Sequence, residues 1–174
     1  MERLKLVIPT EEHESQVMKF LSEIQERNEY IAGFNGLEIV SSYADWIMLN
    51  KLILKTTIPV DVYLAVRIND DKVVGIIDAR HYLSESLLNF NGNIGFSIRP
   101  AYRENGYATE MLGLVLEKCR EYGEEKVLIT CAKGNIASAK TIIKNGGILE
   151  NEVEDTVGLV KSGEKIIQRY WINL

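Results

Sequence analysis

The sequence contains few of the residues from which disulfide frameworks and metal sites are built. Its 174 residues include two cysteines, two histidines and three prolines. Cys119 and Cys131 both lie in apolar, periodic segments, which favours buried free thiols over a disulfide framework. Because the sequence has neither a CxxC pair nor a cluster of cysteine and histidine, it predicts no metal site.

Long apolar runs are also missing. No stretch approaches the roughly 20 apolar residues that a helix needs to cross a bilayer. The charged start, Met1 to Lys5, is not followed by the apolar core of a signal peptide. The net charge of -5 argues against a nucleic-acid surface, which carries a basic stripe. We therefore expect a cytoplasmic protein that binds neither membranes nor nucleic acids.

The periodicity predicts a mixed sheet of the α+β class in a single domain, residues 1–174. The length of 174 residues, 46% of them hydrophobic, suffices for one core and is short for two. Alternating or β-rich segments predict strands at 4–8, 62–68, 72–82, 93–98, 126–131, 148–157 and 166–172. Helical spacing and capping residues predict helices at 10–28, 43–51, 107–123 and 135–145. Gly75, inside a predicted strand, indicates a bulge or a close approach.

The stretch from Phe96 to Ala108 organises the chain. It reads as a strand that stops at Pro100, a loop containing Gly106, and a helix that begins near Tyr107. Gly106 allows a positive φ, and the small Ala108 leaves the backbone open. Free loop amides and the positive end of the helix dipole together form an anion site suited to a pyrophosphate. The alternative is an ordinary strand-to-helix turn with an incidental glycine.

A second motif follows at the appropriate distance. Arg103-x-x-Gly106-x-Ala108 is followed, after an intervening β-rich segment, by an Asn-x-x-Ser helix that runs from Asn135 to the Gly146–Gly147 pair. In this order the two motifs resemble those of the GCN5-related N-acetyltransferases, the GNAT superfamily. The resemblance covers Val62 to Leu174 well, and the first third only through its strand–helix–helix order.

The resemblance implies the acyl-CoA N-acyltransferase fold, a mixed and mostly antiparallel sheet with helices on both faces. The strands that end at Ile98 and near Cys131 would splay apart, and the pantetheine arm of acetyl-CoA would lie between them. The implied pantetheine contacts are Phe96, Ser97 and Ile98. The implied pyrophosphate contacts are Arg103, Glu104, Asn105, Gly106, Tyr107, Ala108 and Thr109. Asn135, Ser138 and Lys140 would border the arm and the nucleotide, although Asn135 also fits a helix N-cap and Lys140 a solvated helix residue.

The family reaction is direct attack of an amine on the acetyl thioester, and a lysine-like amine with a pKa of about 10.4 must first lose a proton. Asp78 and His81, at the end of a strand beside the cofactor strand, are the candidate bases. The alternative is a surface pair between Asp78 and Arg80 with an exposed His81. Many family members place a tyrosine acid seven residues after the capping asparagine, where this chain has Ile142. Either another tyrosine serves, or CoA leaves as the thiolate.

We therefore predict an acetyl-CoA-dependent N-acetyltransferase that acts on a primary amine of a small molecule or a protein. The first third should supply the acceptor side, where Tyr30 and Glu38 are candidate contacts. The Ile142 departure keeps open a second function, a non-catalytic acyl-CoA-binding sensor or regulatory domain. A Rossmann or P-loop protein is disfavoured, because G-x-G-x-x-G after the first strand and G-K-[ST] are both missing. By resemblance, a homodimer is plausible.

Overall fold

The computed structural model describes residues 2–29, 33–53, 59–84, 88, 91–156 and 165–174. Its strands are β1 (Leu4–Val7), β2 (Val60–Arg67), β3 (Val73–Arg80), β4 (Ile94–Ile98), β5 (Lys126–Ala132), β6 (Ile148–Glu154) and β7 (Ile166–Asn173). Its longer helices are α1 (Glu14–Glu26), α2 (Tyr43–Ile53), α3 (Tyr107–Glu121) and α4 (Ile136–Lys144). All the helices and strands expected from the sequence are therefore present. The connection between β6 and β7, residues 157–164, lies outside the described residues.

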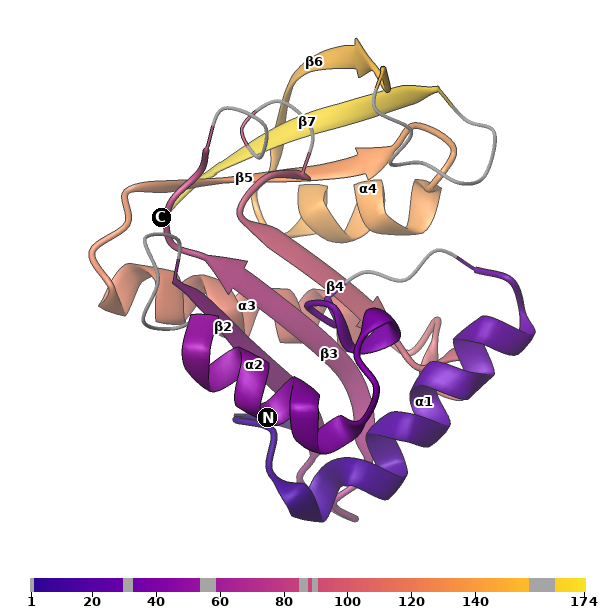
Figure 1. Cartoon of the computed structure of the whole chain (residues 1–174). Coiled ribbons are helices and arrows are strands. Elements are labelled where there is room, and N and C mark those ends of the chain that lie inside the picture. The colour runs from indigo at the N-terminus through magenta and orange to yellow at the C-terminus, as the bar shows by residue number, and fades with distance from the viewer. Residues whose placement is uncertain (1, 30–32, 54–58, 85–87, 89–90, 157–164) are drawn as a thin grey trace.

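The strands form two antiparallel sheets, with the orders β1-β2-β3-β4 and β5-β7-β6. Helices α1 and α2 cover one face of the first sheet, and α3 covers the other (Figure 1). The expected α+β class, with helices on both faces of a mostly antiparallel sheet, is confirmed. None of the helices in the described part of the chain is long and apolar enough to span a membrane.

Each face of the first sheet has its own hydrophobic core. On the α3 face, Ile77 and Ala79 pack with Met111 and Leu112. On the opposite face, Ile76 packs with residues of α1 and α2, including Phe20 and Trp46. Each fully buried side chain of this size stabilises the fold by roughly 1.5–3 kcal/mol. The alternation along β3 therefore decides which helix layer each of its side chains meets.

Gly75 confirms the close approach expected from the sequence. A Cβ atom at this position would lie 2.8 Å from Ile98 Cδ1 and 2.8 Å from Met111 Sδ. The register between β2 and β3 also shifts here, between Ala65 and Val66, as in a β-bulge. The missing side chain lets α3 press against the sheet next to the end of β4.

Asn93 joins the two sheets. Its backbone N–H donates to the Leu128 carbonyl at 2.7 Å, and its side-chain oxygen accepts from the Leu128 N–H at 2.8 Å. Its side-chain amide also donates to the Arg80 carbonyl at 2.8 Å. Beyond the adjoining Gly92–Ile129 bridge, β4 pairs with β3 and β5 pairs with β7. The strands thus diverge in the way that the family resemblance implied.

Replacing Asn93 with alanine should therefore destabilise the whole chain. The Asn93→Ala variant leaves the Leu128 N–H and the Arg80 carbonyl without their side-chain partner, which should lower the free energy of unfolding by roughly 2–4 kcal/mol. Urea denaturation measures this change. Asn173→Ala, at an exposed strand end, is the control and should stay within about 0.5 kcal/mol of wild type. Equal effects of the two substitutions would contradict the role of the junction.

Candidate functional site

The loop between β4 and α3 has the backbone that an anion site requires. Gly106 adopts a left-handed conformation with φ of 78°, as predicted, and forms the N-cap of α3. At the start of the helix, the Glu110 N–H donates to the Gly106 carbonyl at 3.2 Å. The earlier N–H groups of the first turn therefore have no carbonyl partner within the helix. A Cβ atom at Gly106 would meet only Arg3 Nη2, at 3.5 Å, so the mouth of the helix is open.

Arg103 connects this loop to β4 and to the segment that follows α1. Its Nε donates to the Ile98 carbonyl at 3.1 Å, and its two Nη atoms donate to the Glu29 carboxylate at 3.0 and 2.5 Å. These bonds use three of the five N–H donors of the guanidinium, so two are left for a ligand. The hydrogen-bonded Arg103 guanidinium lowers the pKa of Glu29. A parallel pair, Arg99 with Glu23 at 2.7 and 2.8 Å, fixes the preceding turn to α1.

Asn135 caps α4, as the sequence predicted. Its side-chain oxygen accepts from the Ser138 N–H at 3.1 Å. Asn135 and Lys140 are both exposed, and Ser138 is half-buried. At its other end α4 is tied to α3, because the Asn145 amide donates to the Thr109 carbonyl at 3.2 Å. The two motifs thus come from helices that contact each other.

Ile142 belongs to the core. It is 0% exposed and packs in the same cluster as Met111 and Leu112. The position at which many family members carry a tyrosine acid is therefore closed to a polar group. Among the remaining predicted contacts, Phe96 and Ser97 are half-buried and Ile98 is buried in β4.

Asp78 lies on β3, the strand that pairs with β4, and is 1% exposed. It pairs with Gly95 in the register of β3 and β4, and its Oδ2 lies 3.1 Å from the position that a Gly95 Cβ atom would occupy. Arg80 Nη2 lies 2.9 Å from Asp78 Oδ1. Burial raises the pKa of Asp78, and the charge of Arg80 opposes this rise. The pair with Arg80 that the alternative expected does form, but its expected surface location was wrong, because Asp78 is buried and the Arg80 side chain is 19% exposed.

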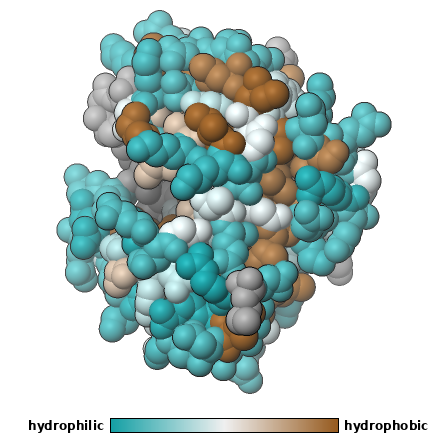
Figure 2. All heavy atoms as spheres, turned by 180° about the vertical axis from the view of Figure 1, so that it is seen from behind, coloured by the Kyte–Doolittle hydropathy of each residue, from teal (hydrophilic) through white to brown (hydrophobic). Residues whose placement is uncertain are grey.

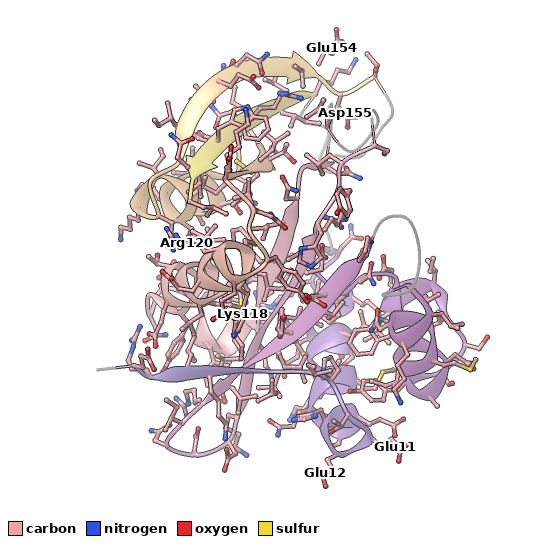
Figure 3. All side chains as sticks on the ribbon, turned by 90° about the vertical axis from the view of Figure 1, so that its left-hand side faces the viewer. Glu11, Glu12, Lys118, Arg120, Glu154 and Asp155 are labelled. Carbon is pink, nitrogen blue, oxygen red and sulfur yellow. The ribbon has the colours of Figure 1, made fainter. Side chains whose placement is uncertain are left out.

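His81 directly follows β3, and its ring lies at the C-terminal end of α3, beside Tyr122. Its Nδ1 lies 2.7 Å from Glu124 Oε1, its Nε2 lies 3.0 Å from Asp61 Oδ2, and its ring centroid is 4.0 Å from that of Tyr122. Hydrogen bonding to Asp61, with a further contribution from Glu124, raises the pKa of His81. Lys118 and Arg120 mark this half of α3 in Figure 3. Since the side chain is only 10% exposed, the alternative of an exposed His81 was wrong as well.

The two candidate bases therefore have different surroundings. Asp78 adjoins Gly95 and the strand expected to hold pantetheine, whereas both ring nitrogens of His81 are engaged by carboxylates. Alternation along β3 was the signal that separates them, because residues 78 and 81 point to opposite faces. Glu38 is exposed on the 3₁₀ turn Leu37–Ile39, and its charge adds to the rise in the pKa of Asp78. Tyr30 lies outside the described residues.

Three residues that shape the site could not be recognised from the sequence. Glu23 and Glu29 lie in no motif, and their partners Arg99 and Arg103 are more than 70 residues away. Asn93 resembled an ordinary polar residue at the start of a strand.

Viewed from behind, the surface is mostly hydrophilic, and hydrophobic side chains gather in its upper part (Figure 2). Ile148 and Leu149 of β6 are exposed, at 66% and 45%.

Comparisons with known proteins agree with this geometry. A family model described as an acetyltransferase (GNAT) domain matches residues 3–148. The fold is similar to MccE, a microcin self-immunity acetyltransferase solved with acetyl-CoA and AMP; the alignment has 13% identity and a TM-score of 0.76 and covers 100% of this chain and 94% of that chain. A GNAT-family acetyltransferase from Bacillus anthracis is 20% identical, with a TM-score of 0.71 and coverage of 99% and 95%.

A third similar structure is an acetyltransferase from Salmonella typhimurium that modifies the N-terminal serine of a 50S ribosomal subunit protein. It is 15% identical, with a TM-score of 0.73, and the alignment covers 100% of this chain and 96% of that chain. No curated protein matches the sequence significantly.

A carboxylate placed at the mouth of α3 should abolish acetyl-CoA binding. In the Gly106→Glu variant the new charge faces the bound phosphates, and we expect the Kd for acetyl-CoA to rise roughly 100-fold or more. Isothermal titration calorimetry measures the affinity. Gly123→Glu is a matched control, because Gly123 ends the same helix with φ of 84° and open space around it. It should carry the same backbone strain and bind acetyl-CoA as wild type does. Undiminished binding by Gly106→Glu would refute the site.

The His81 cluster should make stability depend on pH. Its raised pKa means that the folded state holds the proton more tightly than the unfolded state, whose histidine pKa is about 6.5. The stabilisation is therefore complete below that value and is lost as the pH rises through the folded-state pKa. The difference in unfolding free energy between wild type and His81→Gln should shrink between pH 5.5 and 9. A difference that grows with pH would show that the ring is bound in its neutral form.

Proposed function

The chain belongs to the GNAT acetyltransferase family, and we propose that Asp78 is the proton acceptor when it transfers an acetyl group from acetyl-CoA to a primary amine. The observation that carries this assignment is a buried carboxylate beside Gly95, on the strand that leads into the Gly106 loop. Acetyl-CoA is the acyl donor, as in the family. The geometry of this chain supports the assignment of Asp78 as the base.

The proposed cofactor contacts lie along one path. Pantetheine would lie beside Phe96, Ser97 and Ile98, where β4 and β5 diverge. The amides of residues 103–109 and the dipole of α3 would hold the pyrophosphate, and the spare donors of Arg103 would add to them. Asn135, Ser138 and Lys140 would border the path from α4. The open mouth at Gly106 and the capped start of α4 both support this arrangement.

The chemistry uses one proton acceptor. The amine nitrogen attacks the thioester carbonyl carbon, a C–N bond forms, and the C–S bond breaks with its electron pair going to sulfur. The amine attacks as the free base, after one proton of the ammonium has been lost to solvent. The extra proton that the nitrogen carries after the attack passes to the Asp78 carboxylate, directly or through one ordered water. A desolvated carboxylate is a stronger base than one in water, which suits it to an amine near neutral pH. Because Ile142 offers no proton, CoA leaves as the thiolate, an acceptable leaving group with a thiol pKa near 8.5.

The second candidate function is a binding domain without turnover. The apolar environment of Ile142 is the feature that favours it. The buried Asp78 favours the enzyme. Burying an ionisable group to 1% exposure costs stability, and such groups are concentrated at functional sites. CoA release measured with a broad panel of amines separates the two functions, since a sensor would bind acetyl-CoA and release no CoA.

The acceptor is proposed as a primary amine of a small molecule or a protein. A protein acceptor is supported by the similar Salmonella typhimurium structure, whose target is a ribosomal subunit protein. The two buried free thiols, Cys119 and Cys131, support a cytoplasmic location. The single domain over residues 1–174 and the homodimer stay predictions.

The Asp78→Asn variant tests the proposed base. Turnover should fall by roughly 10²–10⁴-fold, the usual contribution of a general base, while the Kd for acetyl-CoA stays unchanged. Since burial raises the pKa of Asp78, its ionised form weakens the fold as the pH rises. The variant should therefore be at least as stable as wild type at pH 8 in urea denaturation. Retained turnover would exclude Asp78 as the base, and unchanged acetyl-CoA binding would leave the cofactor site intact.

A further inference from the structure

A second ionisable residue controls the proposed base. Arg80 follows Asp78 by two positions on β3, so both side chains lie on the same face of the strand. Arg80 Nη2 lies 2.9 Å from Asp78 Oδ1, and the two side chains are 19% and 1% exposed. Arg80 therefore forms an ion pair with the buried Asp78 carboxylate, and among the described residues neither Asp78 oxygen has a partner with hydrogen-bond geometry.

The pair is held from several sides. Gly33 and Gly95 approach the carboxylate, and a Cβ atom at Gly95 would lie 3.1 Å from Asp78 Oδ2 and 3.2 Å from the Gly33 nitrogen. The Arg80 backbone is fixed at the same time, because its N–H donates to the Asn93 carbonyl and its carbonyl accepts from the Asn93 side chain, both at 2.8 Å. The base of the Arg80 side chain is therefore anchored at the junction between the two sheets.

From this geometry we infer that Arg80 is a positioning residue that keeps the Asp78 carboxylate ionised and so sets the pH at which the transferase begins to work. The inference rests on the proposed role of Asp78. Burial favours the neutral acid, and a neutral acid cannot accept a proton. The adjacent guanidinium stabilises the anion, and at this depth the attraction is screened far less than at the surface. Arg80 touches neither reacting atom and acts through Asp78.

Glu38 acts on the same group with the opposite sign. It lies on the 3₁₀ turn Leu37–Ile39, which follows the segment that covers Asp78. Its negative charge disfavours the Asp78 anion, and Arg80 is the larger of the two influences. Because Glu38 is exposed, solvent screens its effect. Substituting Arg80 should therefore raise the pKa of Asp78, and substituting Glu38 should lower it.

The pH profile of kcat/KM is the test, with saturating acetyl-CoA and one amine acceptor. In Arg80→Gln the acid limb should move to higher pH, with a loss at low pH of tenfold for each unit that the limb moves. At alkaline pH, where Asp78 ionises without help, the rate should return toward that of wild type. Arg80→Lys, which keeps the charge, should restore most of the wild-type profile. Glu38→Gln should move the limb slightly to lower pH.

A control and three contradicting outcomes complete the design. Arg120→Gln removes an exposed arginine, paired with Glu117, and should leave the profile unchanged. A uniform loss in Arg80→Gln at every pH, not rescued by lysine, would show a purely structural role and overturn the inference. An unmoved acid limb with an inactive Asp78→Asn variant would overturn only the inference. An active Asp78→Asn variant would overturn the proposed base and the inference together, and acetyl-CoA titration confirms in each case that the variant is folded.

Discussion

The divergence of β4 from β5 is the constraint on which the rest of the structure depends. Asn93 satisfies the Leu128 N–H and the Arg80 carbonyl where β5 meets the start of β4. Past this point the two strands pair outward, with β3 and β7, and a peptide-like ligand can lie between their facing edges. The same residue anchors β3 beside the proposed base. The proposed cofactor site and the proposed base therefore both adjoin one polar side chain, Asn93, which is 6% exposed.

The loop at the mouth of α3 is held by ion pairs with distant parts of the chain. Its own arginines pair with carboxylates of α1 and of the residues that follow α1, Arg99 with Glu23 and Arg103 with Glu29, and Arg3 pairs with Glu110 in the first turn of α3. Single exposed ion pairs contribute little to stability. Their combined effect is to fix the backbone amides before a ligand arrives, which lowers the entropic cost of binding. The amides and the helix dipole then carry most of the attraction for phosphate.

Local chemistry made part of this site predictable from the sequence. Gly106 and Asn135 were assigned correctly as a positive-φ residue and a helix cap, because a glycine or an asparagine at a helix start acts within a few residues. The pairings of Glu29 with Arg103 and of Asn93 with Leu128 depend on the folded arrangement of distant segments, which no local pattern encodes. His81 and Asp78 looked equivalent at a strand end, yet strand alternation places them in different environments.

In the proposed mechanism, the burial of Asp78 links catalysis to packing. The Gly33 backbone sits so close to the sheet that a Cβ atom there would lie 2.8 Å from the Ile76 carbonyl and 2.9 Å from that of Gly95. This contact removes water from the carboxylate and thereby raises its pKa, which strengthens it as a base and weakens the fold when it ionises. Arg80 offsets both effects. Looser packing around Asp78 would stabilise its anion but would return its basicity to the ordinary value. The close packing of Gly33 and Gly95 therefore contributes to the proposed mechanism.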